Sequence, residues 1–249
     1  MLLLTEFLLR LAFGLAGAMA LVSPRQVSSG YFRNHLYVTM GLSLLAALLA
    51  RAAGAGAFWP AATAAVLSYL GSVCWLYEKP GAGRAALLLV AAAALVGALG
   101  AAPADAAPDG PAQVSAAAYT VTSGALLGLV MGAMLLGHWY LNAPGMALAP
   151  LRRLLIVAAS VAVIHAALAA AGLALEMQAH SVSVRWGLFV TLRWLFGLLG
   201  VVILIWMAWR TLDIPNTQSA TGILYVAVIG TFVGETMGLL LGAESAYPL

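Results

Sequence analysis

Apolar stretches of about twenty residues recur along the whole chain, and this pattern is its strongest constraint on folding. Backbone N–H and C=O groups cannot stay unpaired in lipid, so only helices and closed barrels span a membrane. The short alternating strands of a membrane barrel are absent. With 64% hydrophobic and 8% charged residues, the chain is too apolar for a soluble domain of 249 residues. The sequence therefore predicts an all-α, polytopic membrane protein with a single integral membrane domain.

We expect a bundle of about eight transmembrane helices. They are predicted at residues 2–22, 35–53, 57–77, 85–102, 116–141, 151–174, 184–209 and 222–242. The first span lacks a basic leader and carries charges in its apolar part, so we expect it to be retained and not cleaved as a signal peptide. The gap at 54–56 is either a tight turn or a break in one helix. No internal sequence repeat is evident.

The basic residues in the connections predict the orientation, because cytoplasmic loops are enriched in Lys and Arg. Those after the odd-numbered spans are Arg25, Arg33, Lys79, Arg84, Arg152, Arg153 and Arg210. The other side holds only Arg51 and Arg185. We therefore expect an N-out, C-out protein, with the acidic segment around Asp105 and Asp109 also outside. The expected location is a cytoplasmic membrane of the bacterial type.

Four charged residues lie inside the apolar spans, namely Glu6, Arg10, Arg193 and Glu235. A charge near the bilayer centre costs about 3 kcal/mol on insertion scales, so such residues are usually paired and face the protein interior. A rise of about 1.5 Å per residue places Arg10, Arg193, Glu235 and His165 at nearly one depth in the outer half of the membrane. Glu6 lies one turn further out, at the i,i+4 spacing that allows it to pair with Arg10.

Two interpretations of these residues stay open. The first is a structural charge network that fixes which helices pack together. The second is a site for a polar head group, a proton or a quinone, because ionisable residues within a membrane are candidates for function. In either case we expect a direct pair between Arg193 and Glu235. Nearby hydroxyls are expected from Thr5, Thr191, Thr231 and Thr236.

Glycine recurs at every fourth position in two spans, at Gly230, Gly234, Gly238 and Gly242 and at Gly124, Gly128 and Gly132. Such a stripe allows two helix backbones to approach closely. We expect both stripes to be helix-packing surfaces. A groove for a flat cofactor or a lipid tail is the alternative.

The histidines suggest where a haem b would bind, since it needs two ligands at matching depth on neighbouring helices. His35 and His138 both lie toward the cytoplasmic side, the former at the start of its predicted span. His138 also precedes Trp139 and Tyr140, which are typical of a membrane-interface belt. His165 is a second candidate axial ligand, with no identified partner. No metal-binding motif is found, and the single Cys74 excludes an intrachain disulfide.

These features favour a membrane subunit of a respiratory or redox electron-transfer complex that meets quinone or haem at the outer-half site. Glu235 or His165 would accept the quinol proton, while Arg193 and Arg10 would hold the carboxylates, including that of Glu6. The alternatives are a small proton-coupled transporter and a structural membrane anchor without cofactor.

Membrane lipids and partner subunits are the expected partners. Nucleic acid is not, because the net charge of +3 is small and scattered. The chain contains no nucleotide-binding or hydrolase motif, so whether it is an enzyme stays open.

Overall fold

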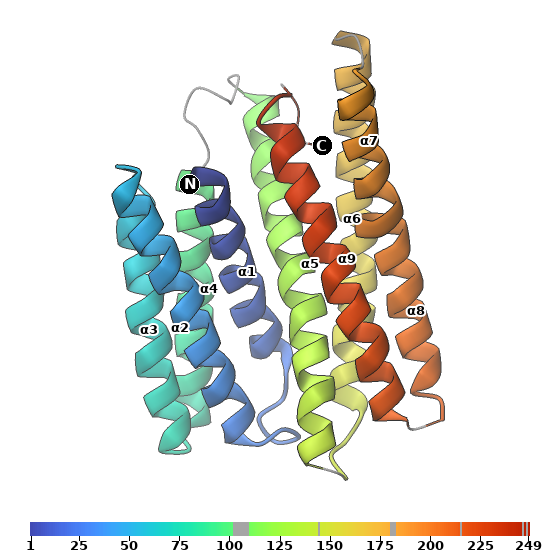
Figure 1. Ribbon diagram of the computed structural model, residues 1–249. Coiled ribbons are helices and arrows are strands. Elements are labelled where there is room, and N and C mark those ends of the chain that lie inside the picture. Colours follow the sequence, from blue (N-terminus) through green and yellow to red (C-terminus); the bar gives the residue numbers. More distant parts are fainter. Residues whose placement is uncertain (102–109, 144, 180–182, 215, 246, 248) are drawn as a thin grey trace.

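The computed structural model describes all residues except 102–109, 144, 180–182, 215, 246 and 248. Its helices are α1 (Leu2–Leu21), α2 (Ser29–Ala52), α3 (Phe58–Leu76), α4 (Pro80–Ala101), α5 (Pro111–Asn142), α6 (Ala149–Ala179), α7 (Val184–Leu192), the π-helix η2 (Arg193–Gly200), α8 (Val201–Thr211) and α9 (Thr217–Gly242). The segments α7, η2 and α8 follow one another without a break and form one span (Figure 1). The acidic segment with Asp105 and Asp109 lies outside the described residues.

Within the described residues, eight helical stretches are long and apolar enough to cross a membrane. This confirms the all-helical class and supports a multi-pass membrane protein. Several helices begin earlier than predicted, because an apolar window misses a polar first turn. Proline adds to this effect at Pro80 and Pro111, since it fits the first turn of a helix, where its missing N–H has no acceptor. The sequence suggested that His35 begins its span. Because α2 starts earlier, His35 lies inside the helix.

The gap at residues 54–56 is a tight turn between α2 and α3. Gly54 adopts a φ of 67°, a conformation that glycine reaches without steric cost. The Ala55 N–H donates to the Ala50 carbonyl at 2.9 Å and closes the end of α2. The turn reverses the chain at the same end of the molecule as both termini (Figure 1).

The helices form two groups of four spans each. In the first group, α1 packs against α2 and α4, and α3 lies against both of these. In the second group, α5 packs against α6 and α9, while η2 and α8 pack against α9 and α8 also reaches α6. Figure 1 shows the two groups side by side, and α1 of the first group faces α5 of the second where they meet. We call them the N-terminal half and the C-terminal half.

The two halves meet closely at the crossing of α1 and α5. A Cβ atom built on Gly128 would lie 1.7 Å from the backbone carbon of Gly14, and one built on Gly14 would lie 1.7 Å from the Gly124 carbonyl oxygen. Only hydrogen fits at these positions. The predicted packing role of the α5 glycines is therefore confirmed.

The glycine stripe of α9 packs against the π-helix. A Cβ on Gly234 would lie 2.3 Å from Gly197 Cα, and one on Gly230 would lie 2.9 Å from the Phe196 carbonyl oxygen. Gly238 lies instead under the guanidinium of Arg193. Gly242 has no atom within 4 Å of such a Cβ, so the packing surface ends before it.

Candidate functional site

The charged residues of four spans converge on one buried cluster at the junction of the two halves. Glu6 and Arg10 come from α1, His165 from α6, Arg193 from the start of η2 and Glu235 from α9. Each of the five is at most 5% exposed. Together with α5 side chains they form what we call the polar network: Glu6, Arg10, Tyr119, Thr120, Thr122, Ser123, His165, Arg193 and Glu235. The sequence predicts one depth for Arg10, His165, Arg193 and Glu235, and the structure joins these four residues in one hydrogen-bonded network.

Arg10 links the N-terminal half to α5. It forms an ion pair with Glu6 one turn earlier on the same helix, as the spacing predicts. Its Nη1 donates to Ser123 Oγ at 3.0 Å, and its Nη2 donates to Thr120 Oγ1 at 3.1 Å. Hydrogen bonds from a charged group are stronger than neutral ones, so this contact ties α1 to α5.

Glu235 holds the centre of the network through both of its carboxylate oxygens. One oxygen accepts a hydrogen bond from Ser123 Oγ. The other lies 2.9 Å from His165 Nε2. Because Ser123 also accepts from Arg10, a continuous chain of hydrogen bonds runs from α1 through α5 to α9 and α6.

Arg193 does not form the direct pair with Glu235 that the sequence suggested. Its Nη2 lies 3.2 Å from His165 Nε2, and its Nη1 donates to the Gly234 carbonyl at 3.3 Å. Among the described residues, the nearest ionisable partner of Glu235 is His165, and no carboxylate is within ion-pair distance of Arg193. The His165 imidazole therefore lies between the Glu235 carboxylate and the Arg193 guanidinium, with its Nε2 facing both groups.

Tyr119 packs against both guanidinium groups. The Arg10 and Arg193 Cζ atoms lie 5.7 and 5.3 Å from its ring centroid, within the range of a cation–π contact. The ring also lies 4.7 Å from that of His165. Its hydroxyl donates to the Leu249 backbone oxygen, so Leu249 covers this side of the network.

Three of the four threonines that the sequence suggested as hydroxyl donors bond to their own backbone, and the suggestion for Thr236 stays a prediction. Thr5, Thr191 and Thr231 each donate to the carbonyl four residues earlier, as threonine often does within helices. The network takes its hydroxyls from α5. The four hydroxyl-bearing residues Tyr119, Thr120, Thr122 and Ser123, near the start of an apolar span, were the available signal.

Two buried donors of the network have no acceptor. The Nε atoms of Arg10 and Arg193 are shielded from solvent and make no hydrogen bond. A buried donor left unpaired costs about 1–3 kcal/mol. This cost would be relieved by an additional oxygen atom, from water or from a ligand.

Comparison with protein-family models, with curated proteins and with solved structures finds no match to this chain. The chemistry of the polar network therefore carries the functional interpretation by itself.

The second predicted site, a haem between His35 and His138, lies at the other end of the molecule. The His35 ring packs 4.5 Å from Tyr31 and 6.2 Å from Trp139, and its Nδ1 lies 2.6 Å from the Tyr31 carbonyl oxygen. His138 Nδ1 lies 3.3 Å from the Tyr225 hydroxyl. Each histidine has its own protein partner, and haem binding by this pair stays a prediction.

His165 is poorly suited to be an axial ligand. Its side chain is fully buried, and both ring nitrogens have protein partners. An iron atom at Nε2 would displace Glu235 and Arg193, and one at Nδ1 would displace Thr122. Within the described part of the chain, no group of three or more His, Cys, Asp or Glu residues is arranged to hold a metal ion.

Proposed function

We propose that this protein is a proton-binding integral membrane protein that works as a small proton-coupled carrier. The observation that carries the proposal is the position of His165 Nε2 between the Glu235 carboxylate, at 2.9 Å, and the Arg193 guanidinium, at 3.2 Å. A carboxylate accepts hydrogen bonds and a guanidinium only donates them. One nitrogen cannot serve both partners in the same protonation state.

The hydrogen bonds of Thr122 define the two states. Its hydroxyl lies 3.0 and 3.1 Å from the Ala118 and Tyr119 carbonyls, which only accept, so its lone pair is directed to His165 Nδ1 at 2.9 Å. Nδ1 then carries a hydrogen in both states. With a bare Nε2, the ring is neutral and accepts from Arg193. With a proton on Nε2, the ring is charged and donates to Glu235. The two states differ by one proton.

The same proton affects the contact between the halves. Glu235 accepts from Ser123, which in turn accepts from Arg10 of the N-terminal half. A proton on His165 Nε2 adds a charge-assisted hydrogen bond to the Glu235 carboxylate, and loss of that proton leaves the carboxylate with Ser123 alone. Protonation of His165 therefore changes the strength of this chain of hydrogen bonds. Coupling of proton binding to a change between two helix bundles is the basis of alternating access around a site at their interface.

Infrared difference spectroscopy between acidic and neutral buffers tests proton binding directly. We expect a buried carboxyl or imidazole signal in the wild type that is lost in Glu235→Gln and in His165→Gln. Glu244→Gln is the matched control, because Glu244 is an exposed residue paired with Arg185. A spectrum unchanged by both network substitutions would contradict the proposal and favour a purely structural anchor.

A membrane subunit of a respiratory or redox complex is the second candidate. The unpaired Nε donors of Arg10 and Arg193 favour it, because a quinone carbonyl is an oxygen acceptor of the kind they lack. In that function Glu235 or His165 would take the proton of quinol. We expect Arg193→Gln to lower the quinone extracted with the purified protein several-fold, with Arg185→Gln as control. Equal quinone content in the two variants, or none in the wild type, would leave the carrier as the better assignment.

We further propose an N-out, C-out orientation in a bacterial-type cytoplasmic membrane, with lipids and partner subunits as partners. The basic residues of the odd-numbered connections support it, because they gather at the end opposite both termini (Figure 1). The polar network then lies in the outer half of the membrane.

A further inference from the structure

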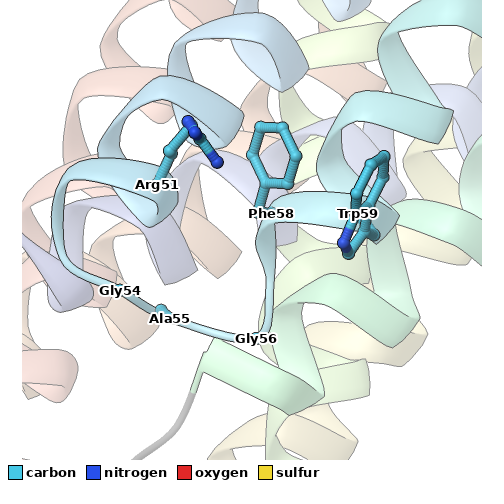
Figure 2. Close-up of a pocket in the computed structure, with 6 residues that line it drawn as sticks. All are labelled: Arg51, Gly54, Ala55, Gly56, Phe58 and Trp59. Atoms are coloured by element: carbon cyan, nitrogen blue, oxygen red, sulfur yellow. The ribbon is translucent and has the colours of Figure 1, made fainter.

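A pocket of about 290 Å³ lies at the turn between α2 and α3, on the end of the molecule that carries both termini. Its lining consists of Arg51, Gly54, Ala55, Gly56, Phe58 and Trp59. Figure 2 shows the Arg51 and Trp59 side chains on either side of Phe58, with the glycine turn below them. This pocket belongs to the N-terminal half and shares no residue with the polar network.

The charge of the pocket is that of one cation. Arg51 lies 5.4 Å from the Phe58 ring centroid, in a cation–π contact that holds its guanidinium beside the cavity. Among the described residues, no carboxylate is within ion-pair distance of it. Its donors face no carboxylate among these residues, and a guanidinium matches the geometry of phosphate oxygens.

The pocket lies where a lipid headgroup would be. Arg51 is the second-last residue of α2, and Trp59 is the second residue of α3. Trp59 is 74% exposed, and an indole at the end of a transmembrane helix is typical of the membrane–water interface. Arg51 at the same level is suited to contact phosphate groups there.

Apolar strips run from the pocket along both helices. On α2, Leu48 and Leu44 precede Arg51 at helical spacing and are 59% and 52% exposed. On α3, Val66 and Leu70 continue the face of Trp59 and are 60% and 50% exposed. Acyl chains of a molecule whose phosphate lies at Arg51 would cover these strips.

We infer that this pocket binds the phosphate group of an anionic phospholipid, whose acyl chains lie along α2 and α3. The inference is independent of the proposed proton chemistry. The cation, the cavity and the two apolar strips each match one part of such a lipid. A soluble phosphate ester would use only the first two.

Two substitutions test the charge and the cavity separately. Arg51→Gln removes the cation. Gly56→Leu fills the cavity and leaves Arg51 in place, since a Cβ at Gly56 would meet no atom within 4 Å and its φ is not positive. Arg185→Gln is the control, because Arg185 is a basic residue at the same end and pairs with Glu244.

Each variant of the full chain is reconstituted with phosphatidylglycerol and phosphatidylcholine in equal amounts, and the retained lipid is measured by native mass spectrometry. We expect phosphatidylglycerol retention to fall about fivefold in Arg51→Gln, the effect of one basic side chain at a lipid surface, and to a similar degree in Gly56→Leu. It should be unchanged in Arg185→Gln.

Three results would overturn the inference. The first is undiminished phosphatidylglycerol retention in Gly56→Leu, which would show that the pocket is not needed and that the charge of Arg51 acts alone. The second is equal retention of the two lipids by the wild type. The third is complete displacement of the lipid by equimolar glycerol 3-phosphate, which would show that the apolar strips do not contribute.

Discussion

At the scale of single residues, His165 determines how the buried charges are satisfied. Glu6 and Arg10 neutralise each other within one helix, whereas Arg193 and Glu235 meet only through the imidazole. A buried charge without its partner costs about 3–5 kcal/mol. The network is therefore stable only as a unit, and its members should not act additively.

A double-mutant cycle on Arg193→Gln and Glu235→Gln measures this coupling. We expect each single substitution to lower the free energy of unfolding by about 3–5 kcal/mol. The double variant should lose less than the sum, because neither charge is then left alone. Thermal or denaturant unfolding in detergent provides the values. Purely additive losses would show that the two residues do not interact through His165.

Gly238 is the position at which a single methyl group should disturb the network. A Cβ there would lie 1.8 Å from Arg193 Nη1 and 2.8 Å from the Tyr119 hydroxyl. We expect Gly238→Ala to lower stability by about 1–3 kcal/mol, the usual cost of overpacking. Gly242→Ala, on the same helix with open space around it, should be neutral or stabilising. Equal melting temperatures for the two variants would contradict this.

The network could be predicted from the sequence only for its charged members. Charges are rare in a span, so their depths could be compared. His165, Arg193 and Glu235 do cluster, and Arg10 joins them through Ser123. Hydroxyls were assigned by proximity in depth alone, and this failed for Thr231, which bonds back to its own helix. Which face of α5 presents Ser123 depends on how α5 crosses α1, and one sequence does not show that rotation.

At the scale of helices, Arg193 is the first residue of the π-helix η2. A π-helix has wider turns than an α-helix and is frequent at functional sites. It places both Arg193 and Gly197 against α9, the first near Gly238 and the second at Gly234. An apolar stretch has the same mean hydropathy in an α-helix and in a π-helix. The sequence therefore did not predict the π-helix.

The crossing of α1 and α5 is the tightest contact between the halves, and it yields an element-scale prediction. At Gly128 a Cβ would meet backbone atoms of Gly14 and Leu15, at 1.7 and 2.1 Å. Backbone cannot move aside as a side chain can, so the helices themselves must separate. We expect Gly128→Ala to reduce stability by more than Gly238→Ala, where the nearest atoms belong to a flexible arginine.

The matched control for this crossing is Gly17→Ala in α1, where a Cβ meets no atom within 4 Å. Its melting temperature should match that of the wild type. Equal melting temperatures for Gly128→Ala and Gly17→Ala would contradict the close approach of α1 and α5.

At the scale of the whole molecule, four spans on each side of the α1–α5 contact close into similar rings of neighbours. No sequence repeat predicts this similarity between the halves, because helix packing in lipid requires small residues at the contacts and not a particular sequence. The charged residues of α1 belong to one half, and His165, Arg193 and Glu235 belong to the other. The network therefore lies where relative motion of the halves would break or form its hydrogen bonds.

Orientation in the membrane is the remaining whole-molecule prediction, and exposed positions at the two ends test it. In a Cys74→Ala background, Ala243→Cys probes the end with both termini, and Gln26→Cys probes the end rich in Arg and Lys. Both residues are exposed. Because basic loops stay in the cytoplasm, an impermeant maleimide should label the first variant in intact cells. It should label the second only after permeabilisation. The reverse pattern would place the polar network in the cytoplasmic half of the membrane, and its proton would then exchange with the cytoplasm.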